Sequence, residues 1–437
     1  MSKRYGSHHS QHLRKWITEL IDNCRLTQED AQTIGTIVAS PSKDSPNYYY
    51  EWTRDAALTM QCLLDLVISK EIDYFGAGRD SGVKDIFDNY VLNQWHLQNV
   101  CIEARVPLGE PKFNPDNTLF QEEWGRPQND GPALRAIFLI RYAFYLLEID
   151  RAANYNYVAK LLYDSKYPSS HSIIKRDLEY VCATHLDPCY DLWEELYGFH
   201  FYTLMVQAKS LELGVQIAKY MGDTEAAEFY KRVAHEIREV IHKRFYVHVN
   251  KNKKDPDPAT ASHIVSSIDV SKMPQSIGIR KHDMSIVLAF LHTNQALDLP
   301  ALKTVVDMIA VFRREYQINS TLRSVNALLV GRYPKDEYYG GNPWVLTSAA
   351  FVCAIHTIDT SDPSAAGIKN KISQTVDIEQ IMSTIISFEA HNNDKNPEMS
   401  YAEQINADNM MYLSANKLSW NYVELIRAAL ALKKEHN

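Results

Sequence analysis

The chain has 437 residues, 45% of them hydrophobic, and a formal net charge of −8. This apolar content is typical of a globular protein with a large core, and no segment approaches the ~20 uninterrupted apolar residues that a membrane-spanning helix needs. The charges are spread along the chain without a basic stripe, so we expect neither a nucleic-acid partner nor a membrane partner.

The compartment is not indicated by the sequence. Residues 1–11 are polar and rich in His and Ser, without the apolar segment of a secretion signal. Three locations stay open: the cytoplasm, export by a route without a signal, and a mature secreted form. The cysteines are scattered and include no Cys-x-x-Cys pair, which fits a reducing compartment but leaves distant disulfides open. They are Cys24, Cys62, Cys101, Cys182, Cys189 and Cys353.

Apolar residues recur at three- and four-residue intervals along most of the chain, which predicts helices. The first helix covers about residues 10–24. Further helical runs lie near residues 55–70, 82–103, 132–149, 171–184, 200–221, 224–245, 282–293, 300–316, 344–358, 375–390 and 416–434. Within them, Asp130-Gly131-Pro132 predicts a cap and a proline at the start of a strongly apolar helix. Only residues 245–249 and 264–270 show the alternation of strands.

This order of elements predicts an all-α fold. About a dozen helices joined by alternating short and long loops indicate helical hairpins arranged around a ring. The closed form of such a ring is an (α/α)6 barrel, a toroid of six hairpins, with its long loops collected at one end.

The stretch from Cys189 to Gly198 places three carboxylates and an indole within the five positions from Asp191 to Glu195. It precedes an amphipathic run, so we expect it at the edge between a loop and a helix, with side chains facing a cavity. Neighbouring carboxylates in a poorly solvated place repel each other, so one can stay protonated near neutral pH and act as a general acid. The alternative is an acidic helix N-terminus that complements the helix dipole.

Four other loops mix aromatic and charged residues, and each precedes a predicted helix. They lie in residues 40–55, 109–132, 330–344 and 400–420. Five of the seven tryptophans fall in these loops, in the acidic stretch or at the helix edges beside them: Trp52, Trp124, Trp193, Trp344 and Trp420. Sugar rings offer apolar faces to aromatic side chains and hydroxyls to arginines and carboxylates. The concentration indicates a carbohydrate pocket, although any single Trp can equally anchor a loop to the barrel rim.

The five stretches resemble the glucoamylases, the inverting exo-acting α-glucosidases of glycoside hydrolase family 15. The resemblance rests on the motifs SPNYYYEWTRDAAL, GEPKFN, WGRPQNDGPALRA, YDLWEE and GRYPKDEYYGGNPW and on a late Glu-Gln pair. These motifs follow the family's order from about residue 37 to residue 427. The resemblance implies an (α/α)6 barrel, in agreement with the helix pattern. We also expect one catalytic domain over residues 1–437 without a starch-binding domain, because the chain stops at Asn437 on its last predicted helix.

The resemblance also implies roles for residues of the five stretches. Glu194, the first glutamate of Trp-Glu-Glu, resembles the general acid, and Glu403 resembles the general base that activates water. The residues that resemble those holding the terminal glucose are Arg54, Asp55, Trp193 and Arg332. Those that resemble the pocket wall beside it are Tyr48, Trp52 and Trp420. Those that resemble contacts to the next sugar, or supports of the acid, are Trp124, Glu195 and Trp344.

The chemistry of glycoside cleavage requires two separate carboxyl groups, in agreement with these two roles. Glycoside cleavage needs one protonated carboxyl at the leaving oxygen and one carboxylate at water, and inverting enzymes hold them about 6.5–9.5 Å apart. Glu194 and Glu403 come from opposite halves of the chain, and closure of a ring can bring their loops together. Without the resemblance, Glu403 is more simply a solvated loop glutamate. No His, Cys and carboxylate cluster has ligand spacing, so we expect no metal and no cofactor.

We therefore expect a monomer that hydrolyses α-1,4 bonds, and α-1,6 bonds more slowly, at non-reducing ends of glycogen, starch or maltooligosaccharides and releases β-D-glucose. The family usually has Trp about six residues before Asp191, where this chain has His185, so its chain-length preference stays open. Two alternatives remain: a trehalose-cleaving α/α-barrel hydrolase, and a non-catalytic glucoamylase-like domain that binds glycan or regulates a partner. The presence of both glutamates argues against the second.

Overall fold

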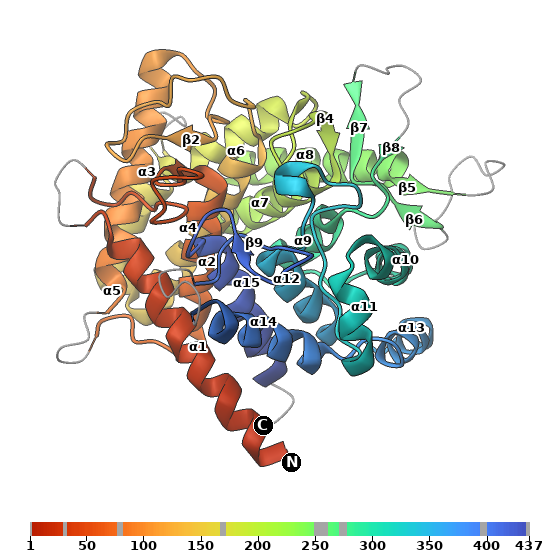
Figure 1. Cartoon of the computed structure of the whole chain (residues 1–437). Coiled ribbons are helices and arrows are strands. Elements are labelled where there is room, and N and C mark those ends of the chain that lie inside the picture. The colour runs from red at the N-terminus through yellow and green to blue at the C-terminus, as the bar shows by residue number, and fades with distance from the viewer. Residues whose placement is uncertain are drawn as a thin grey trace.

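The computed structural model describes residues 2–28, 33–76, 82–166, 172–248, 261–270, 278–393 and 400–433. Within these residues, six helices form an inner ring in which each packs against the next and the last packs against the first (Figure 1). They are α2 (Thr53–Ile68), α4 (Asp130–Ile149), α7 (Phe201–Tyr220), α9 (Met284–His292), α12 (Val345–His356) and α15 (Ser419–Lys433). The predicted (α/α)6 barrel is confirmed.

A second set of helices covers the outside of the ring. They are α1 (Ser2–Arg25), α3 (Lys84–Ala104), α6 (Ile173–Thr184), α8 (Thr224–Phe245), α10 (Leu299–Glu315) and α14 (Ile378–Asn393). The outer helix α8, for example, buries one apolar stripe against the ring and exposes its other face. Inner helices such as α12 are buried on almost every face because they are apolar all round. The predicted helical runs are confirmed for both sets.

Several short helices fill the connections between these pairs. They are α5 (Arg151–Tyr157), a π-helix (Val158–Leu162), α11 (Ile318–Leu322), α13 (Pro363–Ser373) and two 3-10 turns (Arg323–Val325 and Tyr338–Gly340). The sequence analysis missed α13. Only Ala365 and Ile372 of this helix are buried, so its apolar pattern is too sparse to predict a helix.

Ten short strands form small antiparallel sheets in the loops. They are β1 (Glu51–Trp52), β2 (Lys112–Phe113), β3 (Cys189–Tyr190), β4 (Tyr197–His200), β5 (Tyr246–Val247), β6 (His263–Ile264), β7 (Ser267–Asp269), β8 (Gly278–Ile279), β9 (Gln404–Ile405) and β10 (Tyr412–Leu413), counted within the described residues. β1 pairs with β2, β5 with β6 and β9 with β10, and the fourth sheet has the order β3-β4-β7-β8. The two predicted strand regions, 245–249 and 264–270, contain β5, β7 and the second residue of β6, and residue 249 lies outside the described residues. Most of the other strands have two residues, too few for a visible alternation.

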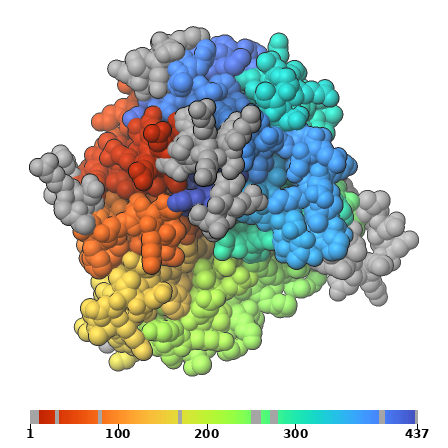
Figure 2. All heavy atoms as spheres, turned by 90° about the horizontal axis from the view of Figure 1, so that it is seen from below, coloured from red at the N-terminus to blue at the C-terminus, as the bar shows by residue number. Residues whose placement is uncertain are grey.

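Ring closure joins the early and late parts of the chain. In Figure 2 the first half, red to green, occupies one side of the visible face and the second half, cyan to blue, the other. The side chain of Asn23 donates to the carbonyl of Lys417 at 2.9 Å, and the N–H of Ser419 donates to the carbonyl of Ala39 at 2.8 Å. The loop before α2 therefore lies against the loop before α15.

The cysteines and the helices of the described residues show neither a disulfide nor a membrane-spanning segment. All six cysteines are buried, and none forms a disulfide within the described residues. Among those residues, no helix has both the length and the apolar character that crossing a bilayer requires.

Candidate active site

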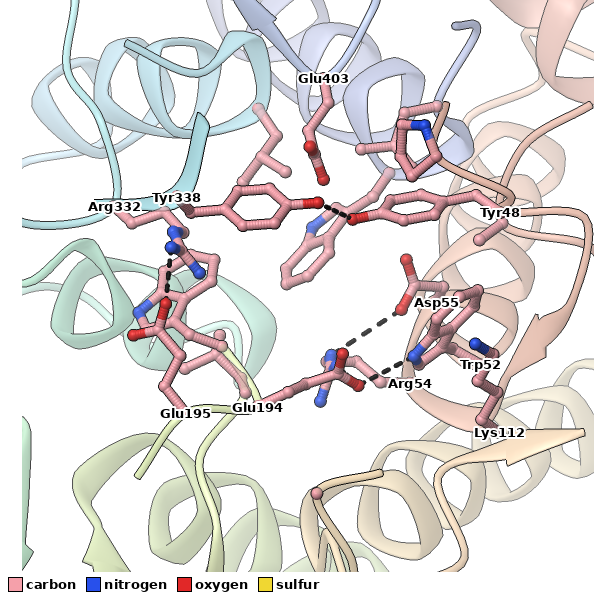
Figure 3. A pocket seen from close by; sticks show the side chains of 18 of the residues that line it. Tyr48, Trp52, Arg54, Asp55, Lys112, Glu194, Glu195, Arg332, Tyr338 and Glu403 are labelled. Atoms are coloured by element: carbon pink, nitrogen blue, oxygen red, sulfur yellow. Dashed lines mark hydrogen bonds and ion pairs between the residues drawn. The ribbon is translucent and has the colours of Figure 1, made fainter. Parts of the chain in front are cut away.

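A cavity of about 490 Å³ lies at the N-terminal ends of the inner helices. Its walls come from segments that precede or begin α2, α4, α7, α12 and α15. All the candidate site residues named from the sequence line it, and Figure 3 shows several of them around the same space. They are Tyr48, Trp52, Arg54, Asp55, Trp124, Trp193, Glu194, Glu195, Arg332, Trp344, Glu403 and Trp420. The fold thus brings the five stretches together.

Glu194 lies in the turn between β3 and β4. The Oδ1 atom of Asp191 accepts hydrogen bonds from the backbone N–H groups of Glu195 at 2.8 Å and Leu196 at 2.9 Å, which closes this turn. Glu194 has a φ of 67°, a conformation that is uncommon outside glycine. The predicted edge between loop and helix is therefore wrong: the bonds to Asp191 form a hairpin turn, and α7 begins only at Phe201.

The Glu194 carboxyl group is held through one of its oxygens. Its Oε1 atom accepts hydrogen bonds from Nε1 of Trp52 at 2.8 Å and Nε2 of Gln128 at 3.0 Å. A guanidinium nitrogen of Arg54 lies 3.6 Å from the same oxygen. The contacts that described residues make to this side chain all use Oε1, so Oε2 is the oxygen that can carry a proton towards a ligand.

Glu403 is buried, with an exposed fraction of 2%, just before β9. Its N–H donates to the carbonyl of Ala415 at 2.8 Å, and its carbonyl accepts from the N–H of Val345 at 3.3 Å. Its Oε2 atom accepts from Oγ of Ser414 at 2.5 Å and from Nε2 of Gln404 at 3.3 Å. Burial raises the pKa of Glu403 to about 7, although the bond from Ser414 opposes this. A group with this pKa can serve as a base near neutral pH.

The two glutamates reach the cavity from opposite sides, as Figure 3 shows. The hydroxyls of Tyr48 and Tyr338 are 2.8 Å apart and lie beside Glu403 in this view. Tyr338 belongs to the quoted motif GRYPKDEYYGGNPW, but the sequence analysis did not single it out. The arrangement leaves a space between two carboxyl groups whose environments differ.

Arg54 and Asp55 form the first turn of α2 and are both buried. Nη1 of Arg54 donates to Oε1 of Gln128 and to Oδ2 of Asp130, each at 2.9 Å. The prediction that Asp130 caps α4 is wrong, because its carboxylate binds Arg54 and Asn129 occupies the cap position. Burial raises the pKa of Asp55 to about 7, although the charge of Arg54 lowers it.

Arg332 is the centre of a second charge cluster. Its guanidinium group donates to both oxygens of Asp336, at 2.8 and 2.7 Å, and to Oε1 of Glu195 at 2.6 Å. The other oxygen of Glu195 accepts from the hydroxyl of Tyr333 at 2.5 Å and from Arg280 at 2.8 Å. Glu195 therefore links the hairpin between β3 and β4 to the loop before α12. Sequence reasoning missed Arg280, which belongs to none of the quoted motifs.

Tryptophan rings pack in two groups around the cavity. The ring centroids of Trp52 and Trp124 are 5.9 Å apart. Trp193 lies 6.1 Å from Trp344 and is stacked with Trp420 at 6.3 Å and an interplanar angle of 19°. The predicted concentration of tryptophans around one pocket is confirmed. Such rings offer the flat apolar surfaces against which sugar C–H faces can pack.

Lys112 also lines the cavity, although the sequence analysis did not single it out. The pairing of β1 with β2 places it opposite Trp52. Its Nζ atom lies 3.8 Å from the ring centroid of Trp124 and 3.9 Å from that of Phe120. Burial lowers the pKa of Lys112 to about 8. Lys112 lies in the quoted motif GEPKFN, but its position opposite Trp52 depends on the register of a two-residue strand, which cannot be derived from sequence.

His185 does not line the cavity. It follows α6 and is buried, with Nδ1 2.9 Å from the carbonyl of Cys182 and Nε2 3.6 Å from Glu236. We therefore expect no contact between His185 and a ligand inside the cavity.

Asp55, Glu194 and Glu195 lie near arginines, and Glu403 accepts from Ser414 and Gln404. In the described part of the chain, no group of three or more His, Cys, Asp and Glu side chains could hold a metal ion.

Comparison with known proteins gives a consistent result over nearly the whole chain. The model of the family "Glycosyl hydrolases family 15" matches residues 21–430. A probable glucoamylase of Schizosaccharomyces pombe is 29% identical over 427 residues, which cover 90% of this chain and 84% of that protein. Glucoamylase-1 of Arthroderma benhamiae is 33% identical over 353 residues, which cover 76% of this chain and 50% of that protein. The chain thus spans about half the length of the second relative.

A solved structure agrees with this result. The glycoside hydrolase family 15 glucoamylase from Hypocrea jecorina superimposes with a TM-score of 0.75 at 25% sequence identity. The superposition covers 98% of this chain and 72% of the other. The shared structure therefore includes both the ring of helices and the loops that line the cavity.

Proposed function

Because the chain belongs to the glycosyl hydrolases of family 15 and is therefore a glycoside hydrolase, we propose that it removes glucose from the non-reducing ends of α-1,4-linked glucans. Glycogen, starch and maltooligosaccharides are the substrates that this proposal names, with slower cleavage of α-1,6 bonds. The relatives named glucoamylase support the substrate class. We further propose that residues 1–437 act as one catalytic domain, because α15 closes the ring against α2.

One observation carries the proposed mechanism: two carboxyl groups from distant parts of the chain face the same cavity from opposite sides (Figure 3). Glu194 gives its proton to the departing glycosidic oxygen, and Oε2 is the atom available for this. Glu403 removes a proton from a water molecule, which attacks the anomeric carbon from the other face. The single displacement inverts that carbon, so an α-linked substrate gives β-D-glucose.

The remaining candidates hold the sugar in this proposal. Arg54, Asp55 and Arg332 supply hydrogen-bonding groups to the terminal glucose, and their ion pairs fix these groups before a ligand arrives. Trp193 and Trp420 give the same sugar an apolar wall. Trp52 borders the pocket and also holds the acid through its indole N–H. Such preorganised groups lower the cost of orienting the substrate.

The direct test is to follow the products of maltose, maltotriose, glycogen and trehalose by proton NMR in the first minutes of reaction. We expect glucose from the first three substrates, with the β-anomeric signal appearing before mutarotation mixes the anomers, and no cleavage of trehalose. The anomer is read from glycogen, where the glucose comes from non-reducing ends. An initial α-glucose signal there would mean direct attack by a carboxylate, which requires carboxyl groups only about 5–5.5 Å apart. Cleavage of trehalose alone would favour the trehalose-cleaving alternative, and no cleavage at all would favour a non-catalytic domain.

The pH dependence tests the assignment of the base. Replacing Ser414 with Ala removes the hydrogen bond that stabilises the ionised form of Glu403, so the pKa of Glu403 rises above its value of about 7. A base must be ionised, so activity falls as the pH drops through this pKa. The acidic limb of kcat/KM should therefore move to higher pH, by roughly one unit.

A matched control is available in the same loop. Ser400 donates to Oε1 of the buried Glu389 at 3.0 Å, and neither residue lines the cavity. The pH profile of Ser400→Ala should coincide with that of the unaltered protein. If the acidic limb of Ser414→Ala does not move, Glu403 is not the base that limits the rate at low pH.

A further inference from the structure

The indole of Trp420 lines the cavity, and its N–H is held by a hydrogen bond to a carboxylate that lies outside the cavity. Trp420 stands in the first turn of α15 and lines the cavity with an exposed fraction of 5%. Its Nε1 atom donates to Oε1 of Glu424, one helical turn later, at 3.1 Å. On its ring faces, Trp420 stacks with Trp193 and lies 5.8 Å from the guanidinium carbon of Arg54. This indole therefore packs beside Trp193 and Arg54 of the pocket and is hydrogen-bonded to the buried carboxylate of Glu424.

Glu424 is fully buried, and its hydrogen-bond donors come from α9 and from α15 itself. Its Oε1 atom accepts from Nε2 of His292 at 2.9 Å and from Nη1 of Arg427 at 2.8 Å, and its Oε2 atom lies 2.9 Å from the same arginine nitrogen. The other ring nitrogen of His292 lies 2.7 Å from the hydroxyl of Tyr202. The chain of contacts runs from α7 through α9 to α15.

The protonation states in this chain of contacts are consistent with each other. Burial raises the pKa of Glu424, but the charge of Arg427 and the hydrogen bonds from His292 and Trp420 outweigh this and lower it to about 2. Burial lowers the pKa of His292, so the ring is neutral and donates only from Nε2. The carboxylate is therefore an ionised acceptor whose partners all donate to it.

A carboxylate in this place has a geometric effect that an apolar residue lacks. An indole can turn over within its pocket, because rotation about χ2 has two broad minima. Only one of these directs the N–H towards Glu424, and leaving a buried indole N–H without an acceptor is unfavourable. Because Arg427 and His292 hold the carboxylate, the carboxylate in turn selects one orientation of the ring that borders the cavity.

We propose that Glu424 is a positioning residue for glycoside hydrolysis: it holds the Trp420 indole in the orientation that forms the wall of the terminal-sugar subsite. The inference rests on the proposed function of that subsite. Glu424 does not line the cavity and acts only through Trp420. Neither the quoted motifs nor the helix pattern pointed to Glu424, because a single acidic residue in an apolar helix carries no signal of its partners.

Two substitutions remove the same contact from its two ends. Glu424→Leu keeps a side chain of similar size but has no acceptor for the indole N–H, and Trp420→Phe keeps an aromatic ring but removes the N–H. We expect each to lower kcat/KM for maltotriose by about 10- to 100-fold, as small misplacements of substrate-orienting groups do. Competitive inhibition by glucose should weaken in parallel, since the same wall borders the bound sugar. The double variant should be no worse than the poorer single variant.

The control is Asp177→Asn, which alters a buried carboxylate paired with Arg135 away from the cavity. It should lower the melting temperature without changing kcat/KM or inhibition by glucose. Losses that multiply in the double variant would overturn the proposal, as would a folded single variant within about twofold of the unaltered protein. If Glu424→Leu does not fold, Trp420→Phe decides alone. An unaltered protein that releases no glucose would instead refute the proposed function.

Discussion

Replacing Glu194 or Glu403 with glutamine is expected to lower kcat by about 10²–10⁴-fold, the usual contribution of a general acid or base. The glutamine side chain has nearly the same volume. At position 194 its amide oxygen can still accept from Trp52 and Gln128, and at position 403 it can accept from Ser414. Circular dichroism and the melting temperature should therefore stay close to those of the unaltered protein, while glucose release from maltotriose falls.

A substrate whose leaving group needs little protonation distinguishes the role of the acid, Glu194, from that of the base, Glu403. An α-glucosyl fluoride needs little protonation on departure, so Glu194→Gln should lose much less activity on this substrate than on maltotriose. Glu403→Gln should lose a similar factor on both, because the attacking water needs its base in each case. Glu212→Gln, which alters a surface pair with Arg238, should leave both activities unchanged. Near-normal turnover in either active-site variant contradicts the role of that glutamate.

Replacing Asp336 with alanine is expected to cost about 3–5 kcal/mol of unfolding free energy, because it leaves a buried guanidinium group without its bidentate partner. Asp336 and Arg332 are both buried, and two hydrogen bonds join them. Of the hydrogen bonds described here, the freed guanidinium group keeps the one to Glu195, and it turns from the direction that the ion pair imposes. The affinity for substrate should fall with stability, which urea unfolding and steady-state kinetics measure separately.

The same substitution on the surface supplies the control. Asp307 pairs with Lys281, and both side chains are about a third or more exposed. An exposed pair contributes at most about 1 kcal/mol, so Asp307→Ala should unfold at nearly the same urea concentration as the unaltered protein. If both variants lose the same unfolding free energy, the buried pair between Arg332 and Asp336 contributes no more to stability than the exposed pair.

The barrel could be predicted from sequence because its inner helices have no polar face. Residues 345–355 form an apolar run that only a buried helix or a buried strand can accommodate, and its length favours the helix. The pocket could be predicted because its residues lie in loops between helices, within motifs that resemble those of one family. Both inferences use patterns within short segments of sequence, and such patterns can be recognised before the fold is known.

Other features depend on contacts between distant segments and leave no local pattern. Asp191 could begin a helix or close a turn, and the hydrogen bonds to Glu195 and Leu196 decide for the turn. Asp130 has the sequence context of a cap, but a buried arginine from α2 takes its carboxylate. Glu424 lies in an apolar helix, where sequence alone cannot distinguish a paired charge from a surface position.

Closure of the ring by α15 against α2 has a consequence for the timing of synthesis. Trp52 and Arg54 belong to the early part of the chain, whereas Glu403 and Trp420 are translated more than three hundred residues later. A ribosome-bound chain that ends before residue 420 therefore lacks one wall of its own active site. Contacts of such long sequence separation also slow folding. The nascent polypeptide should consequently remain inactive until α15 docks against α2.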